Sequence, residues 1–126
     1  MSAIAGLLAL ALTVAAPGPP QTEAGHHCPC LSAAQVRDLA GGWPDWDKDA
    51  LVWLAGAEAS LSAPSGKIYY FGAVNVNEGG SVDRCGWQVN SIHGFDAERL
   101  LTDPFYCAWA AHDVWERQGY QAWSTW

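Results

Sequence analysis

The middle of the chain carries two carboxylates in unlike surroundings, and two amides follow on alternate positions. Glu58 ends an alanine-rich stretch, whereas Asp83 lies where a glycine-rich turn joins a strand that carries Gln88 and Asn90. A desolvated carboxyl can donate a proton while a hydrogen-bonded one stays ionised, and amides can hydrogen-bond the hydroxyl groups of a sugar. The pattern predicts either a solvated hairpin or one wall of a sugar-binding cleft.

Glu58 belongs to a helix that we predict over residues 44–58. Apolar residues recur there at spacings of three and four, which predicts a buried face formed by Ala50, Trp53, Leu54, Ala57 and Leu61. Three aspartates lie near the first turn, where the helix dipole favours anions. At the other end of the helix, desolvation would raise the pKa of Glu58. A solvated glutamate is the alternative, because most glutamates lie at the surface.

Two further helices have clear end signals. Ser32 and Gln35 form a capping-box pattern for a helix over residues 31–41, which Gly41 ends. Asp103 and Pro104 open the last helix, which ends at Gly119. The chain between the helices is rich in turns and predicts short strands at 67–71, 73–77 and 87–92, with a hairpin turn at 78–81. We therefore expect an α+β domain in which a small antiparallel sheet flanks a helical body and a cleft.

The composition excludes several classes of partner. The chain has 126 residues, a net charge of −7 and only six lysines and arginines. Nucleic acid and anionic membrane surfaces both attract basic proteins, so neither is an expected partner. Eight tryptophans indicate a packed core with a few aromatic platforms at a groove. We expect a monomer that uses no cofactor.

The first 22 residues differ from the rest of the chain. Residues 3–16 are uncharged and rich in leucine and alanine, and a Pro-Gly-Pro-Pro segment follows. This apolar run is too short to span a bilayer comfortably but suits a signal peptide, although no basic residue precedes it. An uncleaved anchor or an apolar tail is the alternative. We expect residues 1–22 to be a leader with no stable membrane span after cleavage, and residues 23–126 to be one domain.

Four cysteines behind such a leader suggest disulfides in an oxidising compartment. Three pairings are possible, and a bridge between Cys28 and Cys30 would be strained because only one residue separates them. A zinc site formed by His26, His27 and these two cysteines is disfavoured, because the spacing is tight and no second cysteine pair exists. We therefore expect no metal, and we interpret His93 and His112 as ordinary polar residues.

Several segments follow one another in an order that resembles the lysozyme-like superfamily. Residues 58–60 (EAS), 73–77 (AVNVN), 80–83 (GSVD) and 87–91 (WQVNS) resemble the active-site motif of c-type lysozymes. Residues 100–104, 107–108 and 119–124, together with the opening 31–36, resemble the transglycosylase-like lysozyme domains of actinobacteria and their phages. The resemblance covers the chain from Leu31 onward and implies a lysozyme-like fold.

The resemblance implies a muralytic glycosidase acting on the β-1,4 bond between N-acetylmuramic acid and N-acetylglucosamine. Glu58 would be the general acid and Asp83 the ionised partner. Ser60, Gln88 and Asn90 would contact the sugar, although Ser60 could instead bond to its own helix. The partner would be cell-wall peptidoglycan, and the protein would be secreted or associated with a virion.

The sequence also departs from the family pattern, and this keeps alternatives open. Cys85 replaces a usual glycine, and the cysteine that usually precedes the Asp-Pro helix is missing. A relocated bridge from Cys85 to Cys107 would account for both changes. Residues 62–70 form an extra loop relative to c-type lysozymes. A lytic transglycosylase that uses Glu58 alone, or a wall-binding relative without turnover, are the competing hypotheses.

Overall fold

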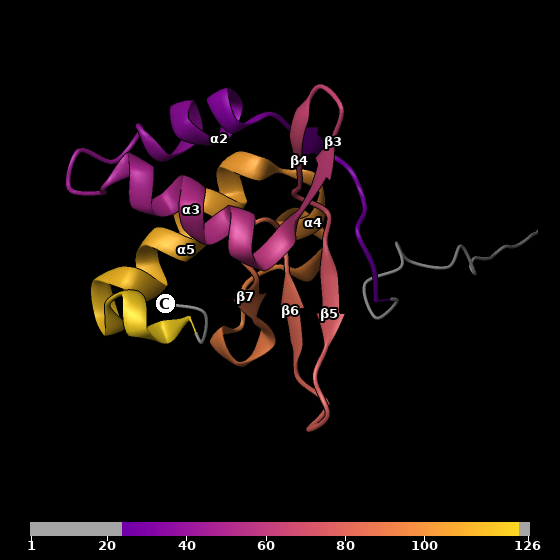
Figure 1. Ribbon diagram of the computed structural model, residues 1–126. Helices are drawn as coiled ribbons and strands as arrows, with labels where there is room; N and C mark the ends of the chain where they lie inside the picture. Colours follow the sequence, from indigo (N-terminus) through magenta and orange to yellow (C-terminus); the bar gives the residue numbers. More distant parts are fainter. Residues whose placement is uncertain (1–23, 124–126) are drawn as a thin grey trace, which may run out of the picture.

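The computed structural model describes residues 24–123, which contain four α-helices and two small antiparallel sheets (Figure 1). The helices are α2 (Ala33–Ala40), α3 (Lys48–Ala59), α4 (Ala97–Thr102), α5 (Pro104–Gln118) and the short 3-10 helices η1 (Ser91–His93) and η2 (Tyr120–Ala122). The strands are β2 (Cys30–Leu31), β3 (Ser60–Ala63), β4 (Gly66–Tyr70), β5 (Val74–Val76), β6 (Val82–Arg84) and β7 (Val89–Asn90). The α+β class predicted from the sequence is confirmed. The leader predicted over residues 1–22 lies outside the described residues.

The two sheets have three strands each, in the orders β2–β4–β3 and β5–β6–β7. In the second sheet, Asn75 pairs with Asp83, and Asp83 pairs with Asn90 on the next strand. Side chains of directly paired residues lie on the same face, so these three polar residues form one row across the sheet. Gly25 extends the sheet edge through two hydrogen bonds with Val74, of 2.8 and 2.9 Å.

The ends of α2 and α5 lie where the capping residues predict them. The Ser32 hydroxyl accepts from the Gln35 N–H, and the Gln35 side chain accepts from the Ser32 N–H, so the capping box is complete. Asp103 caps α5, with Pro104 as its first residue and Gly119 after its last. None of the helices in residues 24–123 is both long and apolar enough to cross a bilayer.

The predictions for α3 need two corrections. The helix begins at Lys48 with Asp47 as its N-cap, because the Asp47 carboxylate accepts from two N–H groups of the first turn. The buried face lies at a different position around the helix axis from the one predicted, since Trp53 is 53% exposed. The side chains buried from this helix are Leu51, Leu54, Ala55 and Ala59. The predicted set of buried positions is shifted by about one residue from the observed set. The prediction failed because alanines and other apolar residues occur on neighbouring faces of this helix, so their spacing is compatible with either face.

The segment predicted as an extra loop over residues 62–70 is instead a hairpin. Strand β3 continues directly from the end of α3 and pairs with β4 along its whole length, from Ser60 opposite Tyr69 to Ala63 opposite Gly66. Pro64 and Ser65 form its turn. The strand signal in β4 was found from the sequence, whereas the short serine-rich partner strand has little β propensity and was missed.

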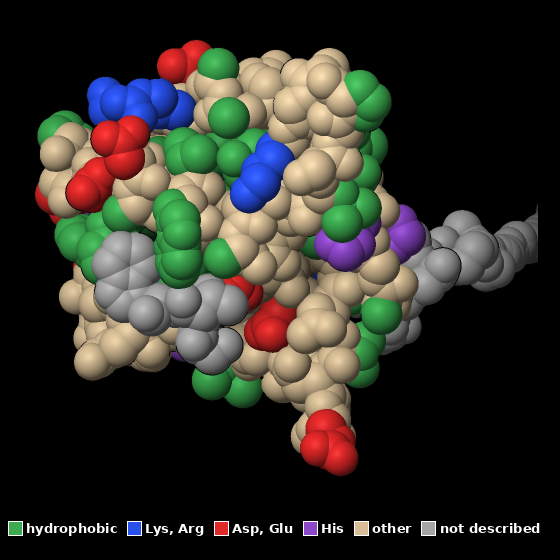
Figure 2. Space-filling model, viewed as in Figure 1, with side chains coloured by type: hydrophobic (Ala, Val, Ile, Leu, Met, Phe, Trp, Pro, Cys, Tyr) green, Lys and Arg blue, Asp and Glu red, His purple; other side chains and the backbone are tan. Residues whose placement is uncertain are grey.

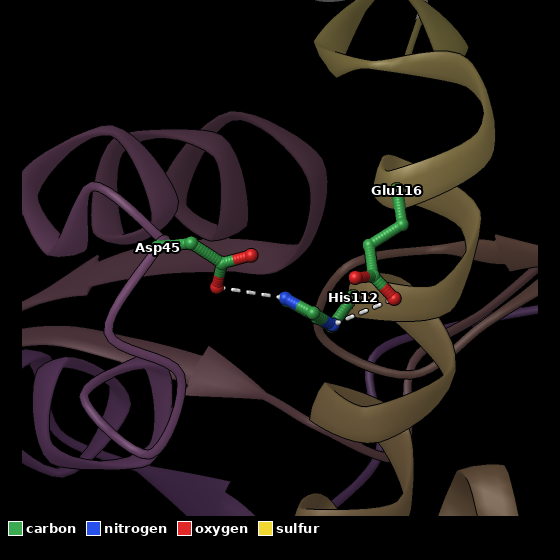
Figure 3. Close-up of side chains that lie close together, drawn as sticks. All are labelled: Asp45, His112 and Glu116. Atoms are coloured by element: carbon green, nitrogen blue, oxygen red, sulfur yellow. Dashed lines mark hydrogen bonds and ion pairs between the residues drawn. The ribbon is translucent and has the colours of Figure 1, made fainter.

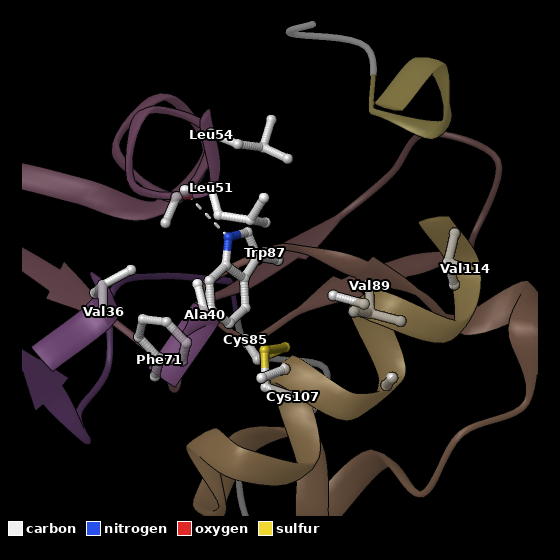
Figure 4. Close-up of a cluster of buried hydrophobic side chains, with 14 of the residues drawn as sticks. Val36, Ala40, Leu51, Leu54, Phe71, Cys85, Trp87, Val89, Cys107 and Val114 are labelled. Carbon is white, nitrogen blue, oxygen red and sulfur yellow. Dashed lines mark hydrogen bonds between the residues drawn. A yellow bond between two sulfur atoms is a disulfide. The ribbon is translucent and has the colours of Figure 1, made fainter. Parts of the chain in front are cut away.

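One hydrophobic core joins the helices to the second sheet (Figure 4). Trp87 lies at its centre, fully buried, and its indole N–H donates to the carbonyl of Leu51 on α3 at 3.0 Å. Phe71 meets the Trp87 ring edge-to-face with centroids 5.0 Å apart. The Cys85–Cys107 disulfide lies in the same core and links the end of β6 to α5. This is the pairing that we inferred from the departures from the family pattern.

The other two cysteines are also paired. Cys28 and Cys30 form a disulfide with their Cα atoms 4.4 Å apart. This separation is at the short end of the range that disulfides span, so one intervening residue is sufficient for the bridge, whose pairing the sequence left open. The bridged segment lies against β4, since Phe71 N donates to Pro29 O at 2.8 Å and Gly72 N donates to His27 O at 2.9 Å.

Candidate functional site

A cavity of about 420 Å³ lies between the helical body and the second sheet. Figure 2 shows acidic side chains in the hollow between these two parts. The lining comes from the end of α3, the polar row of the sheet, η1, and the C-terminal part of α5 with η2. Its residues are Glu58, Asn77, Ser81, Asp83, Gln88, Val89, Asn90, Ile92, His93, Val114, Gln118, Ala122 and Trp123.

A second cavity of about 340 Å³ adjoins the first. Both are lined by Glu58, Asn77, Asp83 and Gln88. The second also reaches the N-terminal segment at His26, which pairs with the edge of β5 through its neighbour Gly25. The two cavities therefore meet at Glu58 and Asp83, the two carboxylates that the sequence singled out. We call the two cavities together the cleft.

Glu58 enters the cleft from the last turn of α3. Leu54 and Ala55, about one turn earlier, and the adjacent Ala59 are buried, which fixes the end of the helix against the protein interior. The side chain of Glu58 is half-buried and lines both cavities. The helix thus places one carboxyl group at the junction of the two cavities on an otherwise alanine-rich surface.

Asp83 enters from the middle of β6 and is held by two amides. Asn90 Nδ2 donates to Asp83 Oδ1 at 2.7 Å, and Asn77 Nδ2 donates to Asp83 Oδ2 at 3.1 Å. Both amides also donate to the Ser81 hydroxyl, at 3.2 and 3.0 Å. Asn75 Nδ2 in turn donates to the side-chain oxygen Oδ1 of Asn77 at 3.2 Å. Donors on both oxygens fix the direction of the carboxylate group.

The structure places Gln88 and Asn90 in the cleft with hydrogen bonds already made. Gln88 precedes β7 at a left-handed φ of 51°, and its Nε2 donates to the carbonyls of Cys85 at 2.9 Å and Ala73 at 3.3 Å. The side-chain oxygen Oδ1 of Asn90 accepts from the backbone N–H of Ile92 at 3.0 Å. These two amides therefore build the cleft wall, Asn90 also orients Asp83, and direct contact with a sugar stays a prediction.

Ser60 lies outside the lining of both cavities. It ends α3 and begins β3, and its hydroxyl donates to the Gly56 carbonyl at 2.6 Å. This is the bond to its own helix that the sequence offered as the alternative role.

Most of the lining residues were not singled out for this role from the sequence, among them Asn77, Ser81 and Trp123. Asn77 and Ser81 occur in the quoted motif, but the bonds from Asn77 to Asp83 and to Ser81 arise from the hairpin geometry. Trp123 is buried, and its indole N–H donates to the Trp87 carbonyl. Nothing near Trp123 in the sequence marks it as a cleft residue, because the contact joins positions far apart in the chain.

His93 also lines the cleft, and its pKa is lowered. Burial lowers its pKa from the ordinary value of 6.5, nearby Arg117 lowers it further, and Asp113 opposes the shift. The imidazole is therefore neutral at physiological pH. In the described part of the chain, the three residues that could together hold a metal ion are Asp45, His112 and Glu116, and none of them lines the cleft.

The cleft thus presents two carboxyl groups from facing elements, one on an apolar helix end and one in an amide network. Such a pair can donate a proton from one side and stabilise positive charge from the other. Comparisons of the chain with protein-family models, with curated proteins and with solved structures find no match.

Proposed function

We propose that this chain is a peptidoglycan-cleaving glycosidase with a lysozyme-like fold, acting as a monomer that is secreted or virion-associated. It hydrolyses the β-1,4 bond between N-acetylmuramic acid and N-acetylglucosamine. The observation that carries the proposal is the position of Glu58 and Asp83, which line the same two cavities from α3 and from β6. A polymer bound across both cavities lies over both carboxylates.

Glu58 is the general acid in this proposal. Glycoside hydrolysis requires a carboxylic acid that protonates the leaving oxygen as the bond breaks. Glu58 is half-buried at the junction of the two cavities, where it can reach the leaving oxygen of a bound sugar chain. After the first step the same group accepts a proton from the incoming water.

Asp83 is the ionised partner. Its two oxygens accept from Asn77 and Asn90, so the carboxylate is ordered before substrate arrives. A carboxylate fixed in this way stabilises the positive charge that develops on the sugar ring, and it needs no reorganisation at that moment.

The backbone at Cys85 supports the lysozyme-like interpretation. Cys85 has a φ of 71°, in the left-handed region that favours glycine. It stands where the family pattern has a glycine. A glycine adopts this conformation without strain, and here a disulfide-bonded cysteine adopts it.

One observation favours a second candidate, a lytic transglycosylase. Both oxygens of Asp83 already accept amide hydrogen bonds, so Asp83 could serve to order the hairpin alone. A transglycosylase needs only Glu58, since the 6-hydroxyl of the substrate attacks in place of water and gives an anhydro sugar.

Digestion of purified peptidoglycan tests the proposal. The full chain, Glu58→Gln and the control Glu78→Gln are incubated with cell walls, and products are identified by mass spectrometry. The Glu78→Gln substitution makes the same chemical change at an exposed position in the loop between β5 and β6. We expect reducing-end muropeptides from the wild type and the control, and none from Glu58→Gln.

The other outcomes decide between the alternatives. Anhydro-muropeptides that vanish in Glu58→Gln identify a transglycosylase. Wall binding without products from any of the proteins identifies a non-catalytic relative. Full activity of Glu58→Gln contradicts both catalytic candidates.

A further inference from the structure

A cluster of three ligand-type side chains lies on the helical body, outside the cleft (Figure 3). Asp45 comes from the turn between α2 and α3, and His112 and Glu116 lie one helical turn apart on α5. His112 Nε2 is 2.9 Å from Asp45 Oδ1, and His112 Nδ1 is 3.5 Å from Glu116 Oε1. One ligand atom from each residue lies within 4.8 Å of the other two.

The imidazole is fixed in place by aromatic packing. His112 is only 8% exposed, and the rings of Trp43, Trp46 and Trp115 lie 5.5, 5.0 and 5.4 Å from its own. The two carboxylates are different, because their side chains are 53% and 56% exposed. The cluster therefore has a rigid nitrogen ligand at its base and two solvent-accessible carboxylates at its rim, where a hydrated ion can arrive.

Each ring nitrogen of His112 has a carboxylate oxygen beside it. A carboxylate can only accept hydrogen bonds, so a doubly protonated ring or a bound cation would satisfy both carboxylates. Within residues 24–123, the ion pairs of Asp45 and Glu116 involve His112 alone, so no lysine or arginine balances the two charges.

We propose that Asp45, His112 and Glu116 bind a divalent transition-metal ion, with Zn²⁺ as the ion that best suits one imidazole and two carboxylates. Ligands about 2.0–2.2 Å from one ion lie about 3 Å from each other, and Asp45 and His112 already have this separation. Glu116 completes the set by a change of its exposed side-chain rotamer, and water fills the open position. The bound ion links the α2–α3 turn to α5.

This site differs from what the sequence predicted, which was no metal and no role for His112. It is also independent of the proposed glycosidase activity, since none of its residues lines the cleft. The turn that supplies Asp45 is remote in sequence from α5, and only the fold brings the three residues together.

Calorimetric titration of the full disulfide-bonded chain with Zn²⁺ at neutral pH tests the proposal. We expect one ion per chain, and dissociation constants at least about tenfold weaker for Asp45→Asn and for Glu116→Gln, the order of loss seen even for outer partners of metal ligands. Both substitutions are at exposed carboxylates and preserve side-chain shape, and circular dichroism checks that each variant is folded. Asp38→Asn and Glu98→Gln are the matched controls at exposed positions outside the cluster.

Two further measurements locate the ion. Co²⁺ should quench tryptophan fluorescence in the wild type and the controls, because three indole rings surround His112, and the quenching should be lost in Glu116→Gln. Mg²⁺, which prefers oxygen ligands alone, should bind more weakly. Absence of saturable Zn²⁺ binding overturns the proposal and identifies the cluster as a protonated hydrogen-bonded link. Binding that is unchanged in both cluster variants overturns it as well and places the ion elsewhere in the chain.

Discussion

The two walls of the cleft hold their carboxylates in opposite ways. On the helical wall, Glu58 projects from an alanine-rich turn whose orientation comes from the core behind it. On the sheet wall, Asp83 is the centre of a network of side-chain hydrogen bonds that includes Asn77, Asn90 and Ser81. Two chemically similar groups are thus given different surroundings, and this difference is what acid and ionised-partner roles require.

The largest effect is expected on the helical wall. Glu58→Gln removes the transferable proton and keeps the shape of the side chain, so the rate of peptidoglycan cleavage should fall about 10³-fold, within the range that general acids contribute. The rate of product release measures this loss against the Glu78→Gln control. A loss of less than tenfold would show that the helical wall is not the acid side of the cleft.

Removing the disulfide that links the sheet to α5 should give the next largest effect, on the free energy of unfolding. The Cys85–Cys107 bridge spans 22 residues and ties the end of β6 to α5. Replacing both cysteines by alanine should lower the free energy of unfolding by about 3 kcal/mol, the entropic estimate for a loop of this size. Urea denaturation measures it.

Replacing Cys85 by glycine instead of alanine, with Cys107 again replaced by alanine, measures the free-energy cost of the left-handed backbone conformation at position 85. The φ of 71° is easy for glycine and costly for alanine, so Cys85→Gly with Cys107→Ala should recover about 1 kcal/mol relative to the double alanine variant. Equal stability of the two variants would show that the left-handed conformation is kept by the disulfide alone and is lost with it.

Asp83→Asn tests the sheet wall directly. If Asp83 stabilises positive charge, this isosteric change should lower cleavage about 10²-fold, a loss near 2.7 kcal/mol of transition-state stabilisation. The same change turns an acceptor into an amide facing two amide donors, so Asn90→Ala serves as the control for disruption of the row. Loss of activity in Asn90→Ala alone, with Asp83→Asn fully active, would make Asp83 a structural residue.

The sequence predicted the ends of α2 and α5 better than it predicted the face of α3 or the contacts of the sheet wall. Helix ends depend on local signals such as Ser32 with Gln35 or Asp103 with Pro104, and these lie within four residues of one another. The face of α3 was read wrongly because alanine spacing does not distinguish neighbouring faces. The Asn77 contact with Asp83 depends on strand register, and no short-range pattern shows which polar side chains will meet across a sheet.

Gly86→Ala probes the packing that supports the sheet wall. A Cβ at this position would lie 2.4 Å from Cζ of Phe71, a side chain enclosed in the core. The ring has to move against Trp87, which should cost about 2 kcal/mol of folding free energy, as overpacking in cores does. Thermal unfolding measures the loss. Gly79→Ala is the control, because its added Cβ would meet no atom within 4 Å.

The smallest predicted effect concerns pH. Burial, with help from Arg117, lowers the pKa of His93 from 6.5, so the unfolded chain binds a proton more readily than the folded one. Stability should therefore decline as the pH falls below about 6.5 and through the lower folded-state pKa. His93→Gln should flatten this decline between pH 7.5 and pH 5, as measured by urea midpoints. An unchanged slope would assign the pH dependence to other groups.

The cleft draws its lining from residues as far apart in the chain as His26 and Trp123. A protease cut or a truncation that releases either segment removes part of the wall, even where Glu58 and Asp83 stay in place. Ligand binding in this cleft is consequently a test of whether the whole described chain has folded. A pair of fragments split in the exposed loop between β5 and β6 should recover binding only when the two halves reassociate.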